Sequence, residues 1–121
     1  RATLDSMTYQ TNDVLSAMEA DSGIRLAALK VDGGASANNY LVQTQADISN
    51  CPVHCPRCAE STAVGAAYLA GLAVGYWDSI QQIQINWAVE RSFHPQISPE
   101  DRNERIGGWL RAVNRSLQWQ K

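Results

Sequence analysis

The feature that most constrains the fold is a short apolar run that stops at two glycines and leads directly into a helical pattern. The run covers residues 26–31, the glycines are Gly33 and Gly34, and helical spacing resumes from Ala37. A run this short suits a strand buried on both faces, as in a parallel sheet. Both glycines can take positive φ and carry no side chain, so the turn can leave its backbone open to a ligand. The segment therefore predicts a strand–turn–helix unit.

The other patterns extend this unit into an alternating order of helices and strands. Helical spacing predicts helices over residues 2–20, 37–48 and 61–74 and from residue 98 onward, and short extended segments are expected at residues 51–57 and 88–93. The first helix should end at residues 21–23, and Ser36 is a candidate cap for the second. The third helix is apolar on all sides, which predicts that it is buried. The rest of residues 77–97 is expected to be a connector.

The last helix has the clearest start signals. Ser98 can cap it, Pro99 suits its first position, and two acidic residues follow in the first turn. One face of this helix is apolar and consists of Ile106, Trp109, Leu110, Val113 and Leu117. We expect the tryptophans of the chain to be packing anchors rather than stacking platforms: Trp77, Trp87, Trp109 and Trp119.

This alternation predicts an α/β fold with an incomplete parallel-type sheet and packed helices. Only two good strands are present, and two parallel strands are a poor independent unit. Helical periodicity begins as early as Leu4, with no capping residue before it. We therefore expect that the chain begins inside a helix and that the missing strands lie upstream of Arg1.

The composition argues against several classes of binding partner. The formal net charge is −2, with 45% hydrophobic and 18% charged residues, as in a soluble globular protein. Nucleic acids and anionic membranes attract clustered basic residues, so neither is an expected partner. The most apolar stretch, residues 63–74, is too short to span a bilayer, and no secretion signal follows Arg1. The expected compartment is the cytoplasm.

The glycine turn is the candidate site for chemistry. A helix N-terminus directly after a flexible turn offers free amides and a positive dipole end to a phosphate or another electron-rich group. Asn38 lies one turn further on and offers both a donor and an acceptor, which suits a purine edge. The segment contains neither G-x-G-x-x-G nor a P-loop motif. Spacing alone therefore leaves two interpretations open, a plain turn and the nucleotide edge of an α/β domain.

Residues 31–39, with the sequence VDGGASANN, resemble the nucleotide-site segment of glycerol kinases, a branch of the FGGY family of carbohydrate kinases. Residues 60–77 resemble the helix that follows in the same family, and residues 9–15 resemble the helix that precedes the strand. Gly108 and Trp109 fit the family's C-terminal pattern. These matches keep the family's order and span nearly the whole chain, so together they are specific.

The resemblance implies an actin-like ATPase fold of the ribonuclease H-like type. Residues 1–121 would be a C-terminal fragment of the second, nucleotide-closing domain, and the first domain would be absent. The backbone of Gly34 and the side chain of Asn38 match positions that contact the adenosine part of ATP or ADP, while Gly33 and Ala35 would shape the same turn. The implied reaction is phosphoryl transfer from ATP to glycerol, giving glycerol 3-phosphate, with Mg²⁺ as a further cofactor.

The resemblance also places the catalytic aspartate, the glycerol-binding residues and the phosphate-binding segment upstream of Arg1. Phosphoryl transfer requires positioning, a base and a metal-bridged phosphate, so the chain alone is predicted to be inactive. Its implied partners are ATP or ADP, the remainder of the kinase chain, glycerol and further copies of the parent in a homo-oligomer. Two alternatives stay open: a fragment of another FGGY sugar or polyol kinase, and a non-catalytic binding module.

A cysteine cluster raises a third alternative, a small zinc protein. Cys51, His54, Cys55 and Cys58 have the residue types of a tetrahedral zinc site. However, only Cys55 and Cys58 have C-x-x-C spacing, and in a strand Val53 and Cys55 would face one way while His54 faced the other. The favoured interpretation is therefore free thiols, and no metal ligand is assigned.

Three other polar residues receive structural interpretations. Asp32 follows the first strand and is expected to cap the turn through its own backbone. Glu60 precedes the third helix and is expected to act as a cap or dipole residue. His94 is expected to be exposed in the connector.

Overall fold

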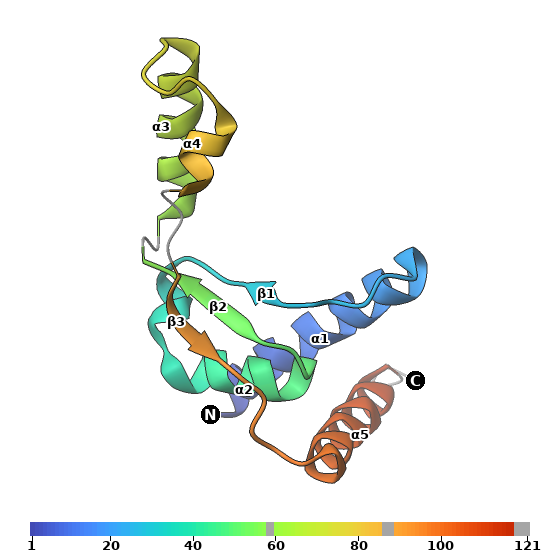
Figure 1. The fold of residues 1–121 in the computed structure, drawn as a ribbon. Coiled ribbons are helices and arrows are strands. Elements are labelled where there is room, and N and C mark those ends of the chain that lie inside the picture. The colour runs from blue at the N-terminus through green and yellow to red at the C-terminus, as the bar shows by residue number, and fades with distance from the viewer. Residues whose placement is uncertain (58–59, 86–88, 118–121) are drawn as a thin grey trace.

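The computed structural model describes residues 1–57, 60–85 and 89–117 of the chain, arranged as helices around a small sheet (Figure 1). The elements, in chain order, are α1 (Ala2–Ser22), β1 (Leu29–Lys30), the 3₁₀ helix η1 (Gly34–Ala37), α2 (Asn39–Ser49), β2 (Val53–Pro56), α3 (Ser61–Ala73), α4 (Ile80–Ile85), β3 (Val89–Phe93) and α5 (Pro99–Ser116). The predicted helices are therefore all present, and α4 is a short helix that the sequence patterns did not predict.

The sheet is mixed, with the strand order β1-β2-β3. β1 runs parallel to β2, with Leu29 opposite Val53, and the pairing continues through a hydrogen bond from the Val31 amide to the His54 carbonyl. β3 runs antiparallel to β2, with Val53 opposite Phe93, and the register shifts after Cys55. The expected α/β class and parallel pairing are confirmed, and the antiparallel third strand is an addition to them.

The exposure of β1 corrects one expectation. Lys30 is exposed and Leu29 is only partly buried, so β1 is not covered on both faces in this chain. β1 is an edge strand here because no described strand pairs with its other side. Its apolar run was the basis for predicting a strand buried on both faces.

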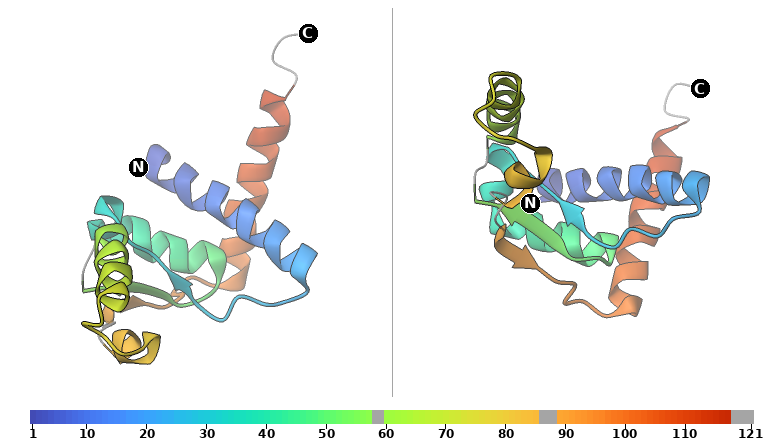
Figure 2. Two further views of the ribbon diagram at one scale, coloured as in Figure 1. Left: turned by 90° about the horizontal axis from the view of Figure 1, so that it is seen from above. Right: turned by 45° about the horizontal axis from the view of Figure 1, so that its top comes forward.

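α1 and α2 lie side by side on one face of the sheet, as both views in Figure 2 show. The core forms where α2 meets the strands. Its buried members are Val42, Ala46, Val53 and Cys55, with Leu29, Val31 and Phe93 packed against them. These seven residues come from the β1 segment, α2, β2 and β3, so the core joins segments that are far apart in sequence.

α1 begins and ends close to the predicted residues, but it buries a different face. It ends at Gly23, whose φ of 69° gives the left-handed cap that glycine favours. Its buried residues are Thr8 and Asn12. The residues at helical spacing are partly buried in one half and exposed in the other: Leu4, Thr11 and Leu15 are partly buried, and Met7, Val14 and Met18 are exposed. The apolar residues of α1 are therefore divided: Val14 and Met18 lie on exposed surface, whereas Met7 borders a cavity beside Leu29.

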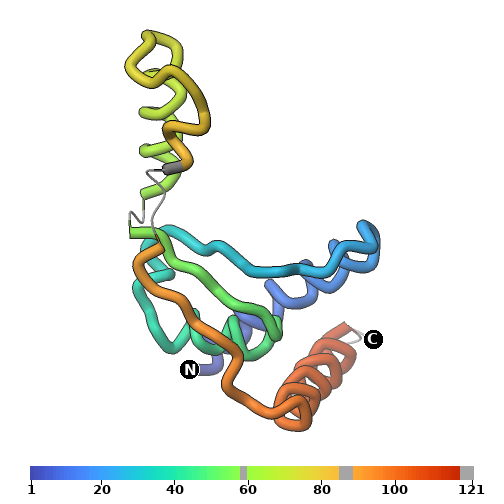
Figure 3. Tube along the Cα trace, viewed as in Figure 1, coloured from blue at the N-terminus to red at the C-terminus, as the bar shows by residue number. Residues whose placement is uncertain are grey.

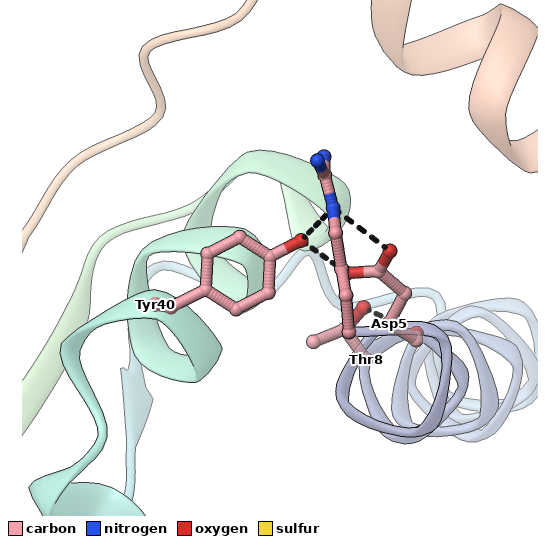
Figure 4. A network of polar contacts seen from close by, with 4 residues as sticks. Asp5, Thr8 and Tyr40 are labelled. Atoms are coloured by element: carbon pink, nitrogen blue, oxygen red, sulfur yellow. Dashed lines mark hydrogen bonds and ion pairs between the residues drawn. The ribbon is translucent and has the colours of Figure 1, made fainter.

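A polar network ties the start of α1 to α2 (Figure 4). The Tyr40 hydroxyl donates to Asp5 Oδ1 at 2.5 Å, and Arg1 Nε donates to the Tyr40 hydroxyl at 2.9 Å. Arg1 also lies 3.6 Å from Asp5 Oδ2. The hydrogen bond to Tyr40, with the charge of Asp5, raises the pKa of Arg1. These contacts connect the first turn of α1 to the first turn of α2.

α5 is anchored to the helical layer by its side chains. Its predicted cap is confirmed, because the Asp101 amide donates to Ser98 Oγ at 3.0 Å. Trp109 stacks on Tyr9 with ring centroids 5.5 Å apart and donates its indole N–H to Asp13 at 2.7 Å. The packing role predicted for Trp109 is therefore confirmed, and Trp87 and Trp119 lie outside the described residues.

α3 and α4, with the residues between them, form an arm that stands apart from the sheet (Figure 1). The tube in Figure 3 shows the chain leaving after β2, passing through the arm and returning into β3. Trp77 holds the arm together by edge-to-face contact with Tyr68, at 5.1 Å between centroids. Leu69 and Val74 are nevertheless 70% and 82% exposed. The predicted burial of this apolar helix is therefore wrong for the described chain.

Within the described ranges, no helix has both the length and the apolar character that crossing a membrane requires.

Candidate functional site

The predicted site residues come together in one turn, here called the glycine corner and defined as residues 33–38. It connects the end of β1 to the start of α2. Gly33 has φ 81° and ψ 173°, a conformation that other residues rarely adopt, whereas Gly34 starts η1 without a positive φ. Both glycines can take positive φ, and in the structure Gly33 does so and Gly34 does not.

The space in front of both glycines is open. A Cβ atom added at Gly33 or Gly34 would meet no described heavy atom within 4 Å beyond its chain neighbours. Gly34, Ala35 and Asn38 are exposed, and Gly33 is partly buried. The corner can thus receive a ligand directly against its backbone.

Ser36 holds the corner from its inner side. It is only 7% exposed, its amide donates to the Gly33 carbonyl at 3.0 Å, and its hydroxyl donates to the same oxygen at 2.7 Å. These two bonds close the 3₁₀ turn and leave the Ser36 hydroxyl unable to cap α2. The prediction that Ser36 caps this helix is wrong.

Asn38 caps α2 instead. Its Oδ1 accepts a hydrogen bond from the Leu41 amide at 3.2 Å, and its own amide donates to the Ala35 carbonyl at 3.1 Å. Its side-chain NH₂ donates to no other described residue. The helix therefore uses the side-chain acceptor of Asn38. The two N–H donors of the same side chain remain available to a ligand at this exposed position.

Two cavities border the corner. One of about 180 Å³ lies between α1 and the corner, with Met7, Leu29 and Ala35 in its wall. Another of about 210 Å³ lies at the ends of β1 and β2, beside Ser61 at the start of α3. Asp32 lines both cavities, is exposed, and makes no side-chain hydrogen bond with another described residue. The predicted capping of the turn by Asp32 is therefore not seen.

Arg91 is a residue of this site that the sequence patterns did not find. It lies on β3 and donates through Nη2 to the Ser36 carbonyl at 2.9 Å and through Nη1 to Asn39 Oδ1. The contacts join residues 55 and 52 positions apart. Because no local pattern reports pairs this distant, only the sheet topology reveals the interaction.

The cysteines belong to the core. Val53 and Cys55 are buried and His54 is not, as the strand alternation predicted, and His54 Nδ1 lies 2.9 Å from Ser92 Oγ. Cys51 and Cys55 are free, and burial raises the pKa of both thiols. Cys58 lies outside the described residues.

The remaining expectations concern metal ligands, the capping role of Glu60 and the exposure of His94. In the described part of the chain, no group of three or more His, Cys, Asp or Glu side chains is placed to hold a metal ion. Glu60 occupies the N-cap position of α3 but makes no side-chain capping hydrogen bond there. His94 is exposed, as expected.

Comparison with solved structures identifies the class of protein to which this fold belongs. The chain superimposes with a TM-score of 0.85 and 33% sequence identity on a structure of Plasmodium falciparum glycerol kinase with ADP, covering 97% of this chain and 24% of that one. It also superimposes on Lactobacillus acidophilus xylulose kinase with a TM-score of 0.81 at 18% identity, which shows a shared fold. The chain therefore has the α/β, actin-like ATPase fold of the sugar kinases.

Sequence comparison gives the family. Residues 1–74 match the C-terminal domain of the FGGY family of carbohydrate kinases. The chain is 61% identical over 121 residues to a glycerol kinase of Agathobacter rectalis. This chain belongs to the FGGY family of carbohydrate kinases. That alignment includes the whole of this chain but only 24% of the length of the Agathobacter protein.

Proposed function

We propose that this chain is the C-terminal part of an ATP-dependent glycerol kinase, which converts glycerol and ATP to glycerol 3-phosphate and ADP. Within that enzyme, residues 1–121 belong to the second domain and supply one wall of the nucleotide site. The glycine corner forms this wall, with Gly33, Gly34, Ala35 and Asn38 as its binding residues. The remainder of the kinase chain supplies the catalytic base, the glycerol site and the phosphate-binding segment.

The open glycine corner is the observation that carries this proposal. A Cβ atom added at Gly34 would meet no described heavy atom within 4 Å beyond its chain neighbours, and Asn38 keeps two side-chain donors at the same exposed position. Amide donors suit the ring nitrogens of adenine, which are acceptors. The 61% identity to a named glycerol kinase and the likeness to an ADP-bound glycerol kinase support the same ligand and reaction.

The contribution of this wall to phosphoryl transfer is the positioning of the nucleotide. Phosphoryl transfer is promoted mainly by positioning the reactants and stabilising charge on the transferred group. The corner contributes positioning, because it fixes the adenosine end of the nucleotide. The described residues offer no cluster of metal ligands, so we assign Mg²⁺ to the phosphates and to residues outside this chain. We place the activity in the cytoplasm, where ATP is available, and expect a homo-oligomeric enzyme.

A fragment of another FGGY kinase is the second candidate. The likeness to the xylulose kinase and to Lactobacillus acidophilus gluconate kinase, each at 18% identity, extends to the fold alone. The high identity to glycerol kinases favours glycerol over these substrates. A small zinc protein and an independent binding module have no comparable support.

Substrate and completeness are tested together in one assay. The full-length polypeptide containing this segment should phosphorylate glycerol far faster than xylulose or gluconate, and purified residues 1–121 should show no turnover. Phosphoryl transfer is measured by a coupled assay for ADP. Turnover by residues 1–121 alone would overturn the assignment of the catalytic residues, and a preference for xylulose or gluconate would overturn the substrate.

The corner itself is tested by separating the two roles of Asn38. Asn38→Ser keeps a capping oxygen but removes the NH₂ donors, so it should preserve stability. Loss of one or two neutral hydrogen bonds corresponds to roughly a 2- to 10-fold weaker affinity for ATP and ADP. The KM for glycerol should stay unchanged, and nucleotide binding is measured by calorimetry on the full-length protein. Equal weakening of glycerol and nucleotide would contradict the assigned role.

A further inference from the structure

We propose that Arg91 is a positioning residue for nucleotide binding, which acts by holding the glycine corner in its open shape. This inference rests on the proposed function, because it assigns Arg91 to the same nucleotide site. It adds a residue from β3 to a wall that otherwise comes only from the β1–α2 connection. Arg91 acts through Ser36 and Asn39, and its own guanidinium group is not a contact of the nucleotide.

The first support is the geometry of the two hydrogen bonds. Nη2 of Arg91 donates to the carbonyl of Ser36, inside η1, and Nη1 donates to the side chain of Asn39, the first residue of α2. The two acceptors lie on either side of Asn38 in the sequence. A planar guanidinium group with a fixed fork of donors can hold both acceptors at once, which an ammonium group on a flexible stem cannot reproduce.

The second support is the scarcity of other restraints on the corner. The outer residues Gly34, Ala35, Ala37 and Asn38 are all exposed. Glycine at two successive positions gives the backbone access to many conformations, and η1 is only four residues long. The short-range bonds of Ser36 close the turn, but they do not connect it to the sheet. Arg91 supplies that connection.

The third support is that Arg91 is itself held in place. It pairs with Cys55 across the antiparallel ladder, so its backbone is fixed by the central strand. Its guanidinium carbon lies 5.8 Å from the centroid of the Phe93 ring, and Phe93 packs against the core. The side chain is only partly exposed. A restrained arginine can therefore restrain the corner in turn.

The experiment compares substrate-specific constants in the full-length polypeptide. Arg91→Ala should raise the KM for ATP and the Kd for ADP about 5- to 20-fold, which corresponds to one or two lost charge-assisted hydrogen bonds. The KM for glycerol should stay within 2-fold and kcat at saturating ATP within about 3-fold, because the loss is in binding. Arg91→Lys should lie between the wild type and Arg91→Ala. Arg115→Ala, an exposed arginine of α5, is the matched control and should leave all constants unchanged.

A double-mutant cycle separates positioning from general stability. Asn39→Ala removes one acceptor of Arg91 and should weaken ADP binding by a smaller factor. The two changes together should weaken it by less than the product of their separate factors, because both act on one interaction. If Arg91→Ala does not fold, Arg91→Lys and Asn39→Ala carry the same comparison.

The outcomes distinguish this inference from the proposed function. If Asn38→Ser weakens nucleotide binding while Arg91→Ala and Arg91→Lys do not, the inference fails and the nucleotide site stands. If Asn38→Ser has no effect on nucleotide binding, the proposed site fails. Equal changes in the constants for ATP and glycerol, accompanied by a lower Tm, would show that Arg91 has only a structural role.

Discussion

The body of this chain encloses a core of apolar residues, whereas the arm leaves a more apolar helix exposed. The body comprises α1, α2 and the three strands, and it encloses Ile48, Val53 and Ala46 completely. The arm comprises α3, α4 and the residues between them, and most of α3 is exposed although it is the most apolar helix in the chain. The body therefore has its own core, whereas the arm has apolar surface without a partner in the described chain.

Under the proposed function, the arm is the part of this chain that the rest of the kinase would cover. Contiguous exposed apolar residues on a helix cost free energy in water and mark candidate interaction surfaces. The relatives are about four times as long as this chain, so a polypeptide of their length has further residues that could cover such a surface. On a smaller scale, Met7, Val14 and Met18 of α1 are also exposed.

The largest expected effect is at Leu69. It is exposed in the described chain, so Leu69→Asp should change the free energy of unfolding of residues 1–121 by no more than about 0.5 kcal/mol. In the full-length protein the new charge would be buried, and the cost should exceed about 4 kcal/mol. Urea unfolding of both polypeptides checks this, and an equally small effect in both would show that the arm stays exposed.

Ile48 provides the counterpart within the body. Its side chain is 0% exposed, so Ile48→Ala should lower the free energy of unfolding by about 2–5 kcal/mol. The cost should be similar in residues 1–121 and in the full-length protein, because the contacts lie within this chain. Chemical denaturation checks both. A cost that appears only in the full-length protein would deny the body a core of its own.

Replacing two glycines of α3 by alanine should change the free energy of unfolding by an intermediate amount, with opposite signs at the two positions. A Cβ at Gly71 would lie 2.2 Å from the Trp77 ring, so Gly71→Ala should destabilise the arm by about 1–3 kcal/mol. Gly65 has open space around its Cβ position, so Gly65→Ala should stabilise residues 1–121 by up to about 1 kcal/mol. Thermal unfolding measures both. If the arm is covered in the full-length protein, Gly65→Ala should become destabilising there.

The smallest expected effect is a pH dependence in the body. Burial raises the pKa of the Cys51 and Cys55 thiols above the ordinary value of 9.0, so the folded state favours the protonated form. The resulting stability is complete below the unfolded-state pKa and is lost as the pH rises through that value and toward the folded-state pKa. The free energy of unfolding should therefore fall between about pH 8 and pH 10. Replacing both cysteines by alanine should flatten this slope, and an unchanged slope would assign it to other groups.

The elements that the sequence predicted well are those fixed by local chemistry. Ser98 and Pro99 start α5, and Gly23 ends α1, because capping depends on residues within one turn. Ser36 and Asn38 both belong to residue types that cap helices, but the sequence pattern indicated only Ser36. Tertiary burial decided between them, since Ser36 is enclosed beneath the corner and Asn38 is not.

The features that the sequence did not predict depend on distant or external partners. Arg91 reaches the glycine corner only because β3 returns to the sheet after the arm, and no pattern near residue 91 reports this. The composition of α3 predicted burial, but most of this helix is exposed among the described residues. For the candidate site, residue type permitted a positive φ at both Gly33 and Gly34, and only the structure shows that Gly33 adopts it and Gly34 does not. The divided roles of Asn38 likewise required the structure.

The central claim is that an adenine nucleotide binds against residues 33–38, and hydrogen exchange measures this most directly. The amides of this segment should exchange more slowly when ADP is added to the full-length protein, while the arm should show little change. Peptides covering residues 33–39 and 61–73 provide the comparison within one experiment. Saturating ADP that protects other segments and leaves residues 33–39 unchanged would contradict the account.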